Sequence, residues 1–192
     1  NMTNYEKNLI KNDYFLSVSR LDTVPKDFET LIEGYSILKK SNIKEKLYII
    51  GEGEGRTKIE RIIEERKLME DVILLGQKQN PYIWMKNSKI FIHSSKYEGL
   101  SVVLLEALIL DKFIVSSNCP TGPTEILTNP KSGELFAVGD ANQLAEKVIK
   151  ILYDKDYQRE LLNNIQLKKK EFELLETTKK LHRIIEKSIN GE

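Results

Sequence analysis

Cysteine, histidine and long apolar runs are scarce in this sequence of 192 residues, and each scarcity excludes a class of protein. The single cysteine, Cys119, excludes an internal disulfide and a cysteine-based metal cluster, as is typical of a reducing compartment. No apolar stretch reaches the length of about 18 residues that a membrane-spanning helix needs, and no signal-peptide pattern opens the sequence. We therefore expect a cytoplasmic protein.

The chain also lacks an excess of charge of either sign. The 30 Lys and Arg residues are balanced by 29 Asp and Glu residues, which leaves a formal net charge of +1. Because nucleic-acid-binding domains carry an excess of basic residues, we expect no nucleic-acid partner. Apolar residues make up 40% of the chain, which is enough for the core of one globular domain or of two small lobes.

Short apolar runs alternate with amphipathic stretches along the chain. The runs predict strands at residues 14–19, 47–50, 72–76, 90–93, 113–116 and 134–138. Helices are predicted to begin near Asp27, Thr57, Asn80, Ser101, Pro123 and Asp140, followed by a long charged helix over residues 156–188 with a break near Phe172. The alternation indicates an α/β fold, a Rossmann-like parallel sheet of about six strands with helices on both faces. It leaves the order of the strands open.

The chain divides into three regions. We interpret the polar, lysine-rich residues 1–13 as a lead-in or linker, residues 14–153 as the α/β domain and residues 154–192 as a helical extension. Ligands of doubly wound sheets bind at the carboxyl ends of the strands. The glycine-rich loops of this chain follow predicted strands, so they are the candidate ligand-binding loops.

Two glutamates eight positions apart, Glu98 and Glu106, mark the strongest functional signal. A predicted strand at residues 90–93, a turn at Gly99 and a helix opened by Ser101 surround them. This arrangement leaves backbone N–H groups free at the positive end of the helix dipole, which favours a bound phosphate. One glutamate lies before the helix and one inside it, so the pair suits hydroxyl groups on either side of a diphosphate. The alternative is a loop acid and a solvated helix acid.

A second glycine-rich loop, Gly51-Glu-Gly53-Glu-Gly55, follows the predicted strand at residues 47–50. It does not match the dinucleotide-binding pattern G-x-G-x-x-G, because Arg56 stands where the last glycine is required. We interpret Gly51 and Gly53 as a tight turn that lets the backbone approach a ligand.

With these features in this order, the chain resembles the retaining glycosyltransferases of the GT-B fold, and most closely the family 4 type. The segment from Glu98 to Glu106 matches the E-x7-E signature. The resemblance covers about residues 14–153 and includes Ser19-Arg20, Lys26, Gly51-Glu-Gly53, Asn80-Pro-Tyr82 and Cys119-Pro-Thr-Gly-Pro-Thr-Glu125. Each match is weak alone, but their common order is specific.

The resemblance implies that the chain is the C-terminal half of a GT-B fold, which binds a nucleoside-diphosphate sugar, here a UDP-sugar. It implies that Arg20 and Lys26 neutralise the diphosphate, that Glu98 faces the transferred sugar and that Glu106 accepts hydrogen bonds from the ribose hydroxyls. The phosphates would be cradled by backbone N–H groups of Gly99, Leu100, Ser101 and Val102. The implied reaction transfers a sugar to a glycan or lipid-linked acceptor in polysaccharide or cell-surface glycan synthesis, with no essential metal and no other cofactor.

Some features depart from the family pattern. Asp27 follows the loop lysine where glycine is common, although it can still cap a helix. Asp154-Lys-Asp156 resembles the metal motif of the other main glycosyltransferase fold, but it lies between helices, so we interpret its acids as helix caps. The residues before Tyr14 are too few for the N-terminal domain that carries the acceptor site, so we expect that partner domain to be missing from this chain.

The two histidines receive no catalytic role from the sequence: His93 is expected to end a strand at the rim of the core, and His182 to lie on the last helix. The Lys168-Lys-Lys170 run suits either peripheral contact with an anionic membrane surface or a solvated helix face. Two other functions stay open, a non-catalytic subunit that binds nucleotide sugars and an epimerase or phosphorylase of the same two-domain fold.

Overall fold

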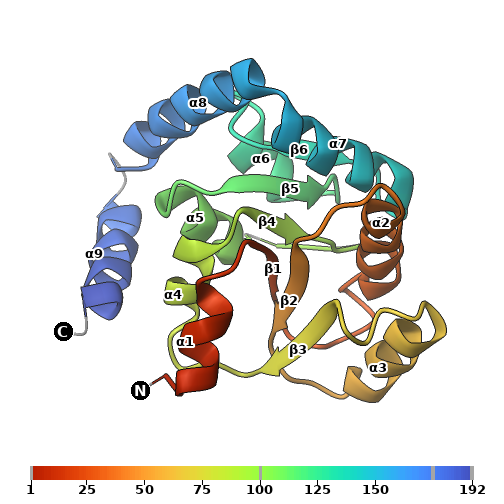
Figure 1. The fold of residues 1–192 in the computed structure, drawn as a ribbon. Helices are drawn as coiled ribbons and strands as arrows, with labels where there is room; N and C mark the ends of the chain where they lie inside the picture. Colours follow the sequence, from red (N-terminus) through yellow and green to blue (C-terminus); the bar gives the residue numbers. More distant parts are fainter. Residues whose placement is uncertain (1, 100, 174–175, 191–192) are drawn as a thin grey trace.

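Six parallel strands form one sheet in the computed structural model, which describes residues 2–99, 101–173 and 176–190 (Figure 1). The strands are β1 (Tyr14–Val18), β2 (Lys46–Ile50), β3 (Val72–Gly76), β4 (Ile90–His93), β5 (Phe113–Ser117) and β6 (Glu134–Phe136). Their order in the sheet is β3-β2-β1-β4-β5-β6, and every neighbouring pair is parallel. The predicted fold class and the six predicted strands are confirmed.

Helices cover both faces of the sheet (Figure 1). One face carries α2 (Phe28–Lys40), α3 (Arg56–Glu65) and α7 (Ala141–Tyr153). The other face carries α4 (Pro81–Asn87) and α5 (Val102–Ile109), with α9 (Glu176–Asn190) packed against both. The short helix α6 (Pro123–Leu127) precedes β6, and α8 (Lys155–Glu173) contacts both α7 and α5, so it passes from one helical layer to the other.

An aromatic cluster fixes α4 on the centre of the sheet. The rings of Tyr14 from β1 and Tyr48 from β2 have centroids 4.7 Å apart, and the Trp84 ring of α4 lies 6.3 and 6.0 Å from them. All three side chains are buried, and the Tyr14 hydroxyl donates a hydrogen bond to the Trp84 carbonyl at 2.6 Å. Such a cluster buries a large apolar area while its polar group keeps a partner.

The first residues form a helix that the sequence analysis did not predict. Residues 1–13 were interpreted as a linker, yet α1 spans Asn4–Ile10. Its first turn is a capping box, in which Glu6 N–H donates to Thr3 Oγ1 at 3.2 Å and Thr3 N–H donates to Glu6 Oε2 at 2.8 Å. Glu6 also pairs with Lys78 after β3 at 2.8 Å. The spacing of Thr3 and Glu6 was the sequence signal for this helix.

The C-terminal extension consists of two helices. The first, α8, spans Lys155–Glu173 and includes Phe172, and the second, α9, spans Glu176–Asn190. Residues 174 and 175 lie outside the described residues, so the break near Phe172 stays a prediction. Asp154 accepts a hydrogen bond from Tyr157 N–H at 2.9 Å and so caps α8 as predicted, whereas Asp156 pairs with Arg159 instead of capping.

The lysine run in α8 serves mainly to attach the helix to the domain. Lys168 is buried and donates to the Asn129 carbonyl at 2.5 Å, and Lys169 pairs with Asp111 at 2.6 Å. Lys170 is exposed. Two of the three ammonium groups are therefore engaged within the domain, which leaves a weaker cationic patch than the sequence suggests.

A buried carboxylate at the start of β6 joins α7 and α8. The Glu134 side chain is 2% exposed and accepts a hydrogen bond from the Tyr157 hydroxyl at 2.5 Å. The ammonium groups of Lys131, Lys147 and Lys150 lie 3.1, 3.3 and 3.5 Å from its oxygens. Burial opposes the charge, but the donors outweigh it and lower the pKa of Glu134.

We expect Glu134→Gln to lower the free energy of unfolding by about 2 kcal/mol at neutral pH, because a neutral amide leaves clustered ammonium groups without their counter-charge. The folded pKa lies below the unfolded value, so the carboxylate stabilises the fold above that unfolded value, and the effect is lost as the pH falls through the folded pKa. The stability difference should therefore shrink in acid. Urea unfolding measures it, with the exposed Glu146→Gln as control, and equal stabilities at neutral pH would contradict the prediction.

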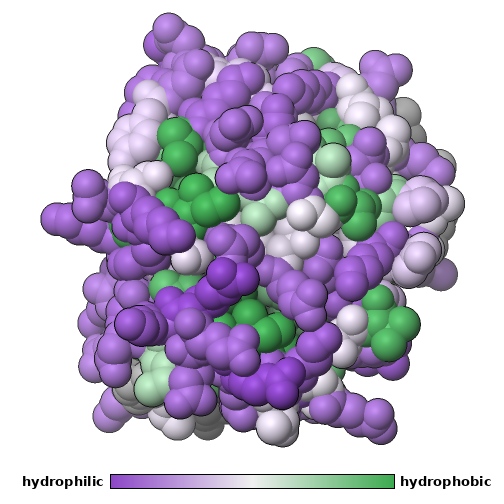
Figure 2. All heavy atoms as spheres, turned by 90° about the vertical axis from the view of Figure 1, so that its right-hand side faces the viewer, coloured by the Kyte–Doolittle hydropathy of each residue, from purple (hydrophilic) through white to green (hydrophobic). Residues whose placement is uncertain are grey.

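The outer side of the layer formed by α2, α3 and α7 faces the viewer in Figure 2. This surface is mainly hydrophilic, and its apolar side chains gather in small separate groups. Within the described ranges, every helix is too short or too polar to cross a membrane. The face in Figure 2 thus shows no broad apolar area that would need a partner.

Candidate functional site

The direction of the connections reverses between β1 and β4, and doubly wound sheets form their ligand-binding crevice at such a point. The chain leaves β1 toward β2 on one side, and it leaves β4 toward β5 on the other side. The connections therefore diverge at the carboxyl ends of these two central strands, which is where doubly wound sheets bind ligands. The loop after β1 carries Arg20 and Lys26, and the loop after β4 carries Glu98. The structure thus places Arg20, Lys26 and Glu98 on the two loops that follow β1 and β4, and it brings Lys26 and Glu98 into contact.

Backbone hydrogen bonds hold the two loops together. Asp27 N–H donates to the Ser94 carbonyl at 3.0 Å, and Lys96 N–H donates to the Pro25 carbonyl at 2.8 Å. Asp27 also caps α2, since its carboxylate accepts from Thr30 N–H at 3.2 Å, as the sequence predicted. The loop that carries Lys26 is therefore fixed at its C-terminal end.

Glu98 is the centre of a hydrogen-bond network. Its Oε1 atom accepts from Ser95 Oγ at 2.7 Å, lies 2.8 Å from His93 Nε2, and pairs with the Lys26 ammonium group. The His93 side chain is 1% exposed and that of Glu98 is 11% exposed. The sequence did not predict that Lys26, expected to neutralise a diphosphate, and Glu98, expected to face a sugar, contact each other.

Hydrogen bonding decides the charge states of this network. Burial opposes ionisation of Glu98, but hydrogen bonds from His93, Lys26 and Ser95 outweigh it and lower the pKa of Glu98 to about 2. Burial also lowers the pKa of His93. The hydrogen bond to Glu98 opposes this effect only in part, and the nearby Lys26 adds to it. At neutral pH the site therefore holds an ionised glutamate and a neutral imidazole.

Arg20 is positioned by the backbone on either side of it. Ser19 N–H donates to the Ile50 carbonyl at 3.0 Å, and Leu21 N–H donates to the Glu52 carbonyl at 3.0 Å. The Arg20 side chain is exposed, and no hydrogen bond or ion pair involves its guanidinium within residues 2–99, 101–173 and 176–190. It is available to an anionic ligand.

The glycines after β2 allow the loop after β2 to lie against the loop after β1, which carries Arg20. A Cβ atom on Gly51, whose φ is +148°, would lie 1.8 Å from the Ser19 carbonyl oxygen, and one on Gly53 would lie 2.7 Å from that of Leu21. The backbone of Gly51 and Gly53 therefore lies close to the loop that carries Arg20. The sequence analysis had expected it to lie close to a ligand instead. Direct contact of Gly51 and Gly53 with a ligand stays a prediction.

The turn before α5 offers the predicted phosphate-binding groups. Ser101 caps α5 without a side-chain hydrogen bond, and its buried Oγ has no partner among the described residues. Val102 is exposed at the first turn, and Gly99 is exposed before it. Leu100, also predicted to contact the phosphates, lies outside the described residues. The free N-terminus of α5 suits an anion.

The loop before α6 packs against the turn that precedes α5. The Thr121 hydroxyl donates to the Glu98 carbonyl, and Gly122 adopts a φ of +85°. A Cβ atom on Gly122 would lie 2.5 Å from the Gly99 carbonyl oxygen. The sequence left this segment open between a ligand-binding ledge and an ordinary helix start, and the structure shows that it contacts the Glu98–Gly99 backbone.

We expect Gly122→Ala to lower the free energy of unfolding by about 1 to 2 kcal/mol, because alanine is strained at this φ and its Cβ would displace the Gly99 carbonyl. The displaced turn should also bind anionic ligands less well. Thermal unfolding and phosphate-analogue binding by calorimetry measure the two effects. Gly139→Ala, also at positive φ but with open space around its Cβ, is the control that separates backbone strain from the clash.

Glu106 lies inside α5 and contacts Tyr82 of α4. The Tyr82 hydroxyl donates to Glu106 Oε1 at 3.1 Å. Burial raises the pKa of Glu106, and this hydrogen bond only partly opposes the effect. Burial and the neighbouring carboxylate raise the pKa of Tyr82 to about 12. A half-buried carboxylate with so few donors leaves acceptor capacity for hydroxyl groups of a ligand.

The sequence analysis missed His93, Ser95 and Tyr82 as members of the site. His93 ends β4 and stands five residues before Glu98, so its place at the carboxyl end of a strand was a readable signal. Tyr82 was noted only as part of a motif. Among the described residues, no cluster of three or more His, Cys, Asp or Glu side chains is arranged to hold a metal ion.

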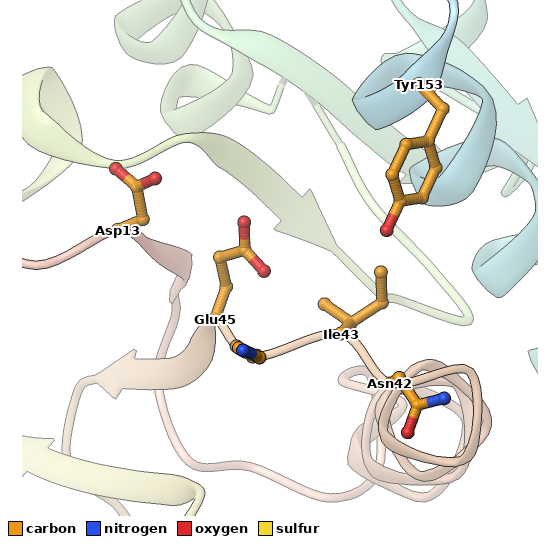
Figure 3. Close-up of a pocket in the computed structure, with 6 residues that line it drawn as sticks. Asp13, Asn42, Ile43, Glu45 and Tyr153 are labelled. Atoms are coloured by element: carbon orange, nitrogen blue, oxygen red, sulfur yellow. The ribbon is translucent and has the colours of Figure 1, made fainter.

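An open pocket of about 500 Å³ lies at the amino ends of the strands, opposite the carboxyl ends that carry the candidate site (Figure 3). Asp13 and Glu45 precede β1 and β2, and Tyr153 points into the pocket from the end of α7. Lys89 already pairs with both carboxylates, at 3.1 and 2.5 Å. This pocket is separate from the crevice at the carboxyl ends.

The fold agrees with comparisons to known proteins. The sequence model of the glycosyl transferases group 1 matches residues 3–170. The chain belongs to this family. A glycosyltransferase of Methanocaldococcus jannaschii without an assigned activity is 29% identical over 95% of this chain and 52% of its own length. The N-acetylgalactosamine-N,N'-diacetylbacillosaminyl-diphospho-undecaprenol 4-alpha-N-acetylgalactosaminyltransferase of Campylobacter jejuni is 32% identical over 85% of this chain and 44% of its own length.

Solved structures of other proteins share the fold. The crystal structure of HepE from Anabaena, in complex with UDP and glucose, superposes with a TM-score of 0.79 at 18% identity, over 95% of this chain and 50% of that protein. The predicted GT-B type of fold is thereby confirmed for the chain. The chain spans about half the length of the curated relatives that it matches.

Proposed function

We propose that this chain is the donor-binding domain of a retaining glycosyltransferase, which transfers a sugar from a UDP-sugar to a glycan or lipid-linked acceptor in polysaccharide or cell-surface glycan synthesis. The observation that carries the proposal is the contact of Lys26 with Glu98 across the carboxyl ends of β1 and β4, with Arg20 exposed on the same loop as Lys26. Two cations and the free N-terminus of α5 suit a diphosphate, and a carboxylate among them suits the hydroxyls of an attached sugar.

The chemistry follows from charge. When the glycosidic bond to the nucleotide breaks, the leaving diphosphate gains negative charge, and prepositioned cations stabilise that charge most where water is scarce. Arg20 is exposed and meets the diphosphate directly. Lys26, whose side chain is 17% exposed, first has to exchange its Glu98 partner for a phosphate oxygen. This exchange couples binding of the donor to release of one Glu98 contact.

The named relatives support the substrate class. The Campylobacter relative is named for an acceptor linked to diphospho-undecaprenol, and a Staphylococcus aureus relative is named a poly(ribitol-phosphate) α-N-acetylglucosaminyltransferase. Both names describe sugar transfer onto lipid-linked or polymeric acceptors. We propose an acceptor of this class, bound by a further domain, and catalysis in the cytoplasm without an essential metal.

Calorimetry of this chain with UDP, GDP and ADP tests the donor assignment. We expect UDP to bind best and Arg20→Gln to weaken UDP binding by about tenfold, because a charge-assisted hydrogen bond to phosphate is lost. Arg61→Gln, which removes an exposed arginine from α3, is the matched control and should bind UDP like the wild type. The proposal is overturned when none of the three nucleotides binds.

A further inference from the structure

The carboxylate of Glu98 is held by one oxygen only. The Lys26 ammonium, the Ser95 hydroxyl and the His93 Nε2 atom all contact Oε1. No hydrogen bond or ion pair of Oε2 is found within the described ranges. Three donors on one oxygen fix the plane of the carboxylate and leave the second oxygen with its full capacity to accept hydrogen bonds.

His93 is more rigidly placed than Lys26. It is the last residue of β4, paired in register with Ser116 of β5, and its side chain is 1% exposed. Lys26 reaches Glu98 through a flexible chain of methylene groups from another loop. A buried ring on a central strand has few alternative rotamers, so its Nε2 atom marks a fixed point in the site.

Ser95 is locked beside the imidazole. Its N–H donates to Ser117 Oγ at 2.8 Å, and the Ser117 hydroxyl donates back to the Ser95 carbonyl at 2.8 Å. Ser95 Oγ lies 3.2 Å from His93 Nε2. Because an ionised carboxylate only accepts hydrogen bonds, a neutral His93 must carry its hydrogen on Nε2 to bond Glu98.

The contacts of His93 and Ser95 with Glu98 have a consequence for donor binding under the proposed function, on which this inference rests. When the diphosphate takes Lys26, Glu98 loses its cationic partner and would be free to rotate or to accept a proton. His93 and Ser95 stay in place, since neither belongs to the loop that carries Lys26. We propose that His93 is a positioning residue, which holds Glu98 by its Oε1 atom so that Oε2 faces the transferred sugar after Lys26 has moved to the diphosphate.

The chain offers variants that separate this role from simple packing. His93→Phe keeps a buried ring but removes the Nε2–H donor. His93→Gln restores an N–H group at a similar reach, so it should rescue the contact. His182→Phe, at the other histidine of the sequence, controls for the loss of an imidazole elsewhere.

The first measurement is a carbon NMR titration of the Glu98 carboxyl in each variant. We expect the midpoint of Glu98 to rise by about one pH unit or more in His93→Phe and to stay close to the wild-type midpoint in His93→Gln and His182→Phe. An unchanged midpoint in His93→Phe overturns the positioning role. If His93→Phe does not fold, the nitrogen shifts of the wild-type ring decide, because a hydrogen on Nδ1 instead of Nε2 also overturns it.

The second measurement compares affinities for UDP and for UDP-glucose, UDP-galactose, UDP-N-acetylglucosamine and UDP-N-acetylgalactosamine. We expect His93→Phe to bind UDP within about twofold of the wild type and to lose the additional affinity that the sugar gives, while His93→Gln retains it. A full sugar-dependent gain in His93→Phe counts against the inference. If the wild type binds no UDP, the donor assignment fails by itself, and the NMR titration still decides whether His93 holds Glu98.

Discussion

Replacing Glu98 by glutamine is expected to separate nucleotide binding from sugar transfer. In the isolated chain, Glu98→Gln should bind UDP about two- to tenfold more tightly than the wild type. The substitution removes a negative charge from the crevice and releases the Lys26 ammonium, which the carboxylate otherwise holds. Since the donor competes with Glu98 for Lys26, the loss of this competitor favours the diphosphate.

Transfer should respond in the opposite direction. In the proposed two-domain enzyme, Glu98→Gln is expected to lower kcat by about a hundredfold to a thousandfold, the range observed when one prepositioned polar group is lost from an active site. Calorimetry with UDP and product formation from a UDP-sugar measure the two effects. Glu64→Gln removes an exposed carboxylate from α3, outside the candidate ligand-binding loops, and serves as the charge control. Weaker UDP binding by Glu98→Gln would show that Lys26 does not exchange partners.

Replacing Glu106 by alanine is expected to lower the affinity for UDP and to keep or raise the stability of the fold. Glu106→Ala should weaken UDP binding by about a hundredfold, because two hydrogen bonds from ribose hydroxyls to a charged acceptor are lost, each worth about 1.5 kcal/mol. The fold should keep or gain stability, since the substitution removes a partly desolvated carboxylate from an apolar helix.

The pH dependence gives this prediction a second, independent readout. The folded pKa of Glu106 is raised above its unfolded value, so Glu106 favours folding most at low pH, and that contribution is lost as the pH rises through the folded pKa. Relative to the wild type, Glu106→Ala should therefore become more stable as the pH rises above about 4.5. Urea unfolding across this range measures the difference.

Tyr82→Phe provides the matched control for Glu106→Ala. It removes the hydroxyl that donates to Glu106 but leaves the carboxylate in place. We expect it to weaken UDP binding by about fivefold only, because the acceptor for the ribose is kept while its orientation is relaxed. Equal UDP affinities of Glu106→Ala and the wild type would exclude Glu106 from the nucleotide site.

The strands and helix starts could be predicted because they depend on patterns within a few residues. The apolar runs placed the six strands because a buried parallel strand must be apolar on both faces. Asp27 and Asp140 marked the starts of α2 and α7, since a cap satisfies backbone N–H groups only a few residues away. The capping box of α1 was present in the sequence in the same way, and it was overlooked because residues 1–13 are polar overall.

Contacts between distant residues could not be read in this way. Lys26 and Glu98 are separated by 72 positions, and they meet only because β1 and β4 are neighbours in the sheet. The alternation of strands and helices does not encode that adjacency. For the same reason, the sequence indicated that Gly51 permits a close approach but not that the approaching group is the Ser19 carbonyl.

The sequence by itself therefore determined the α/β class and the strands, and it marked Glu98, Glu106, Arg20 and Lys26 as candidate site residues, because periodicity, caps and turns act over a few residues. The tertiary structure decided the strand order, the pairing of Lys26 with Glu98 and the place of His93 beside them. These depend on which strands lie side by side and on how deeply each side chain is buried. Burial and hydrogen bonding then set the charge states, which keep Glu98 ionised and make Glu106 harder to ionise.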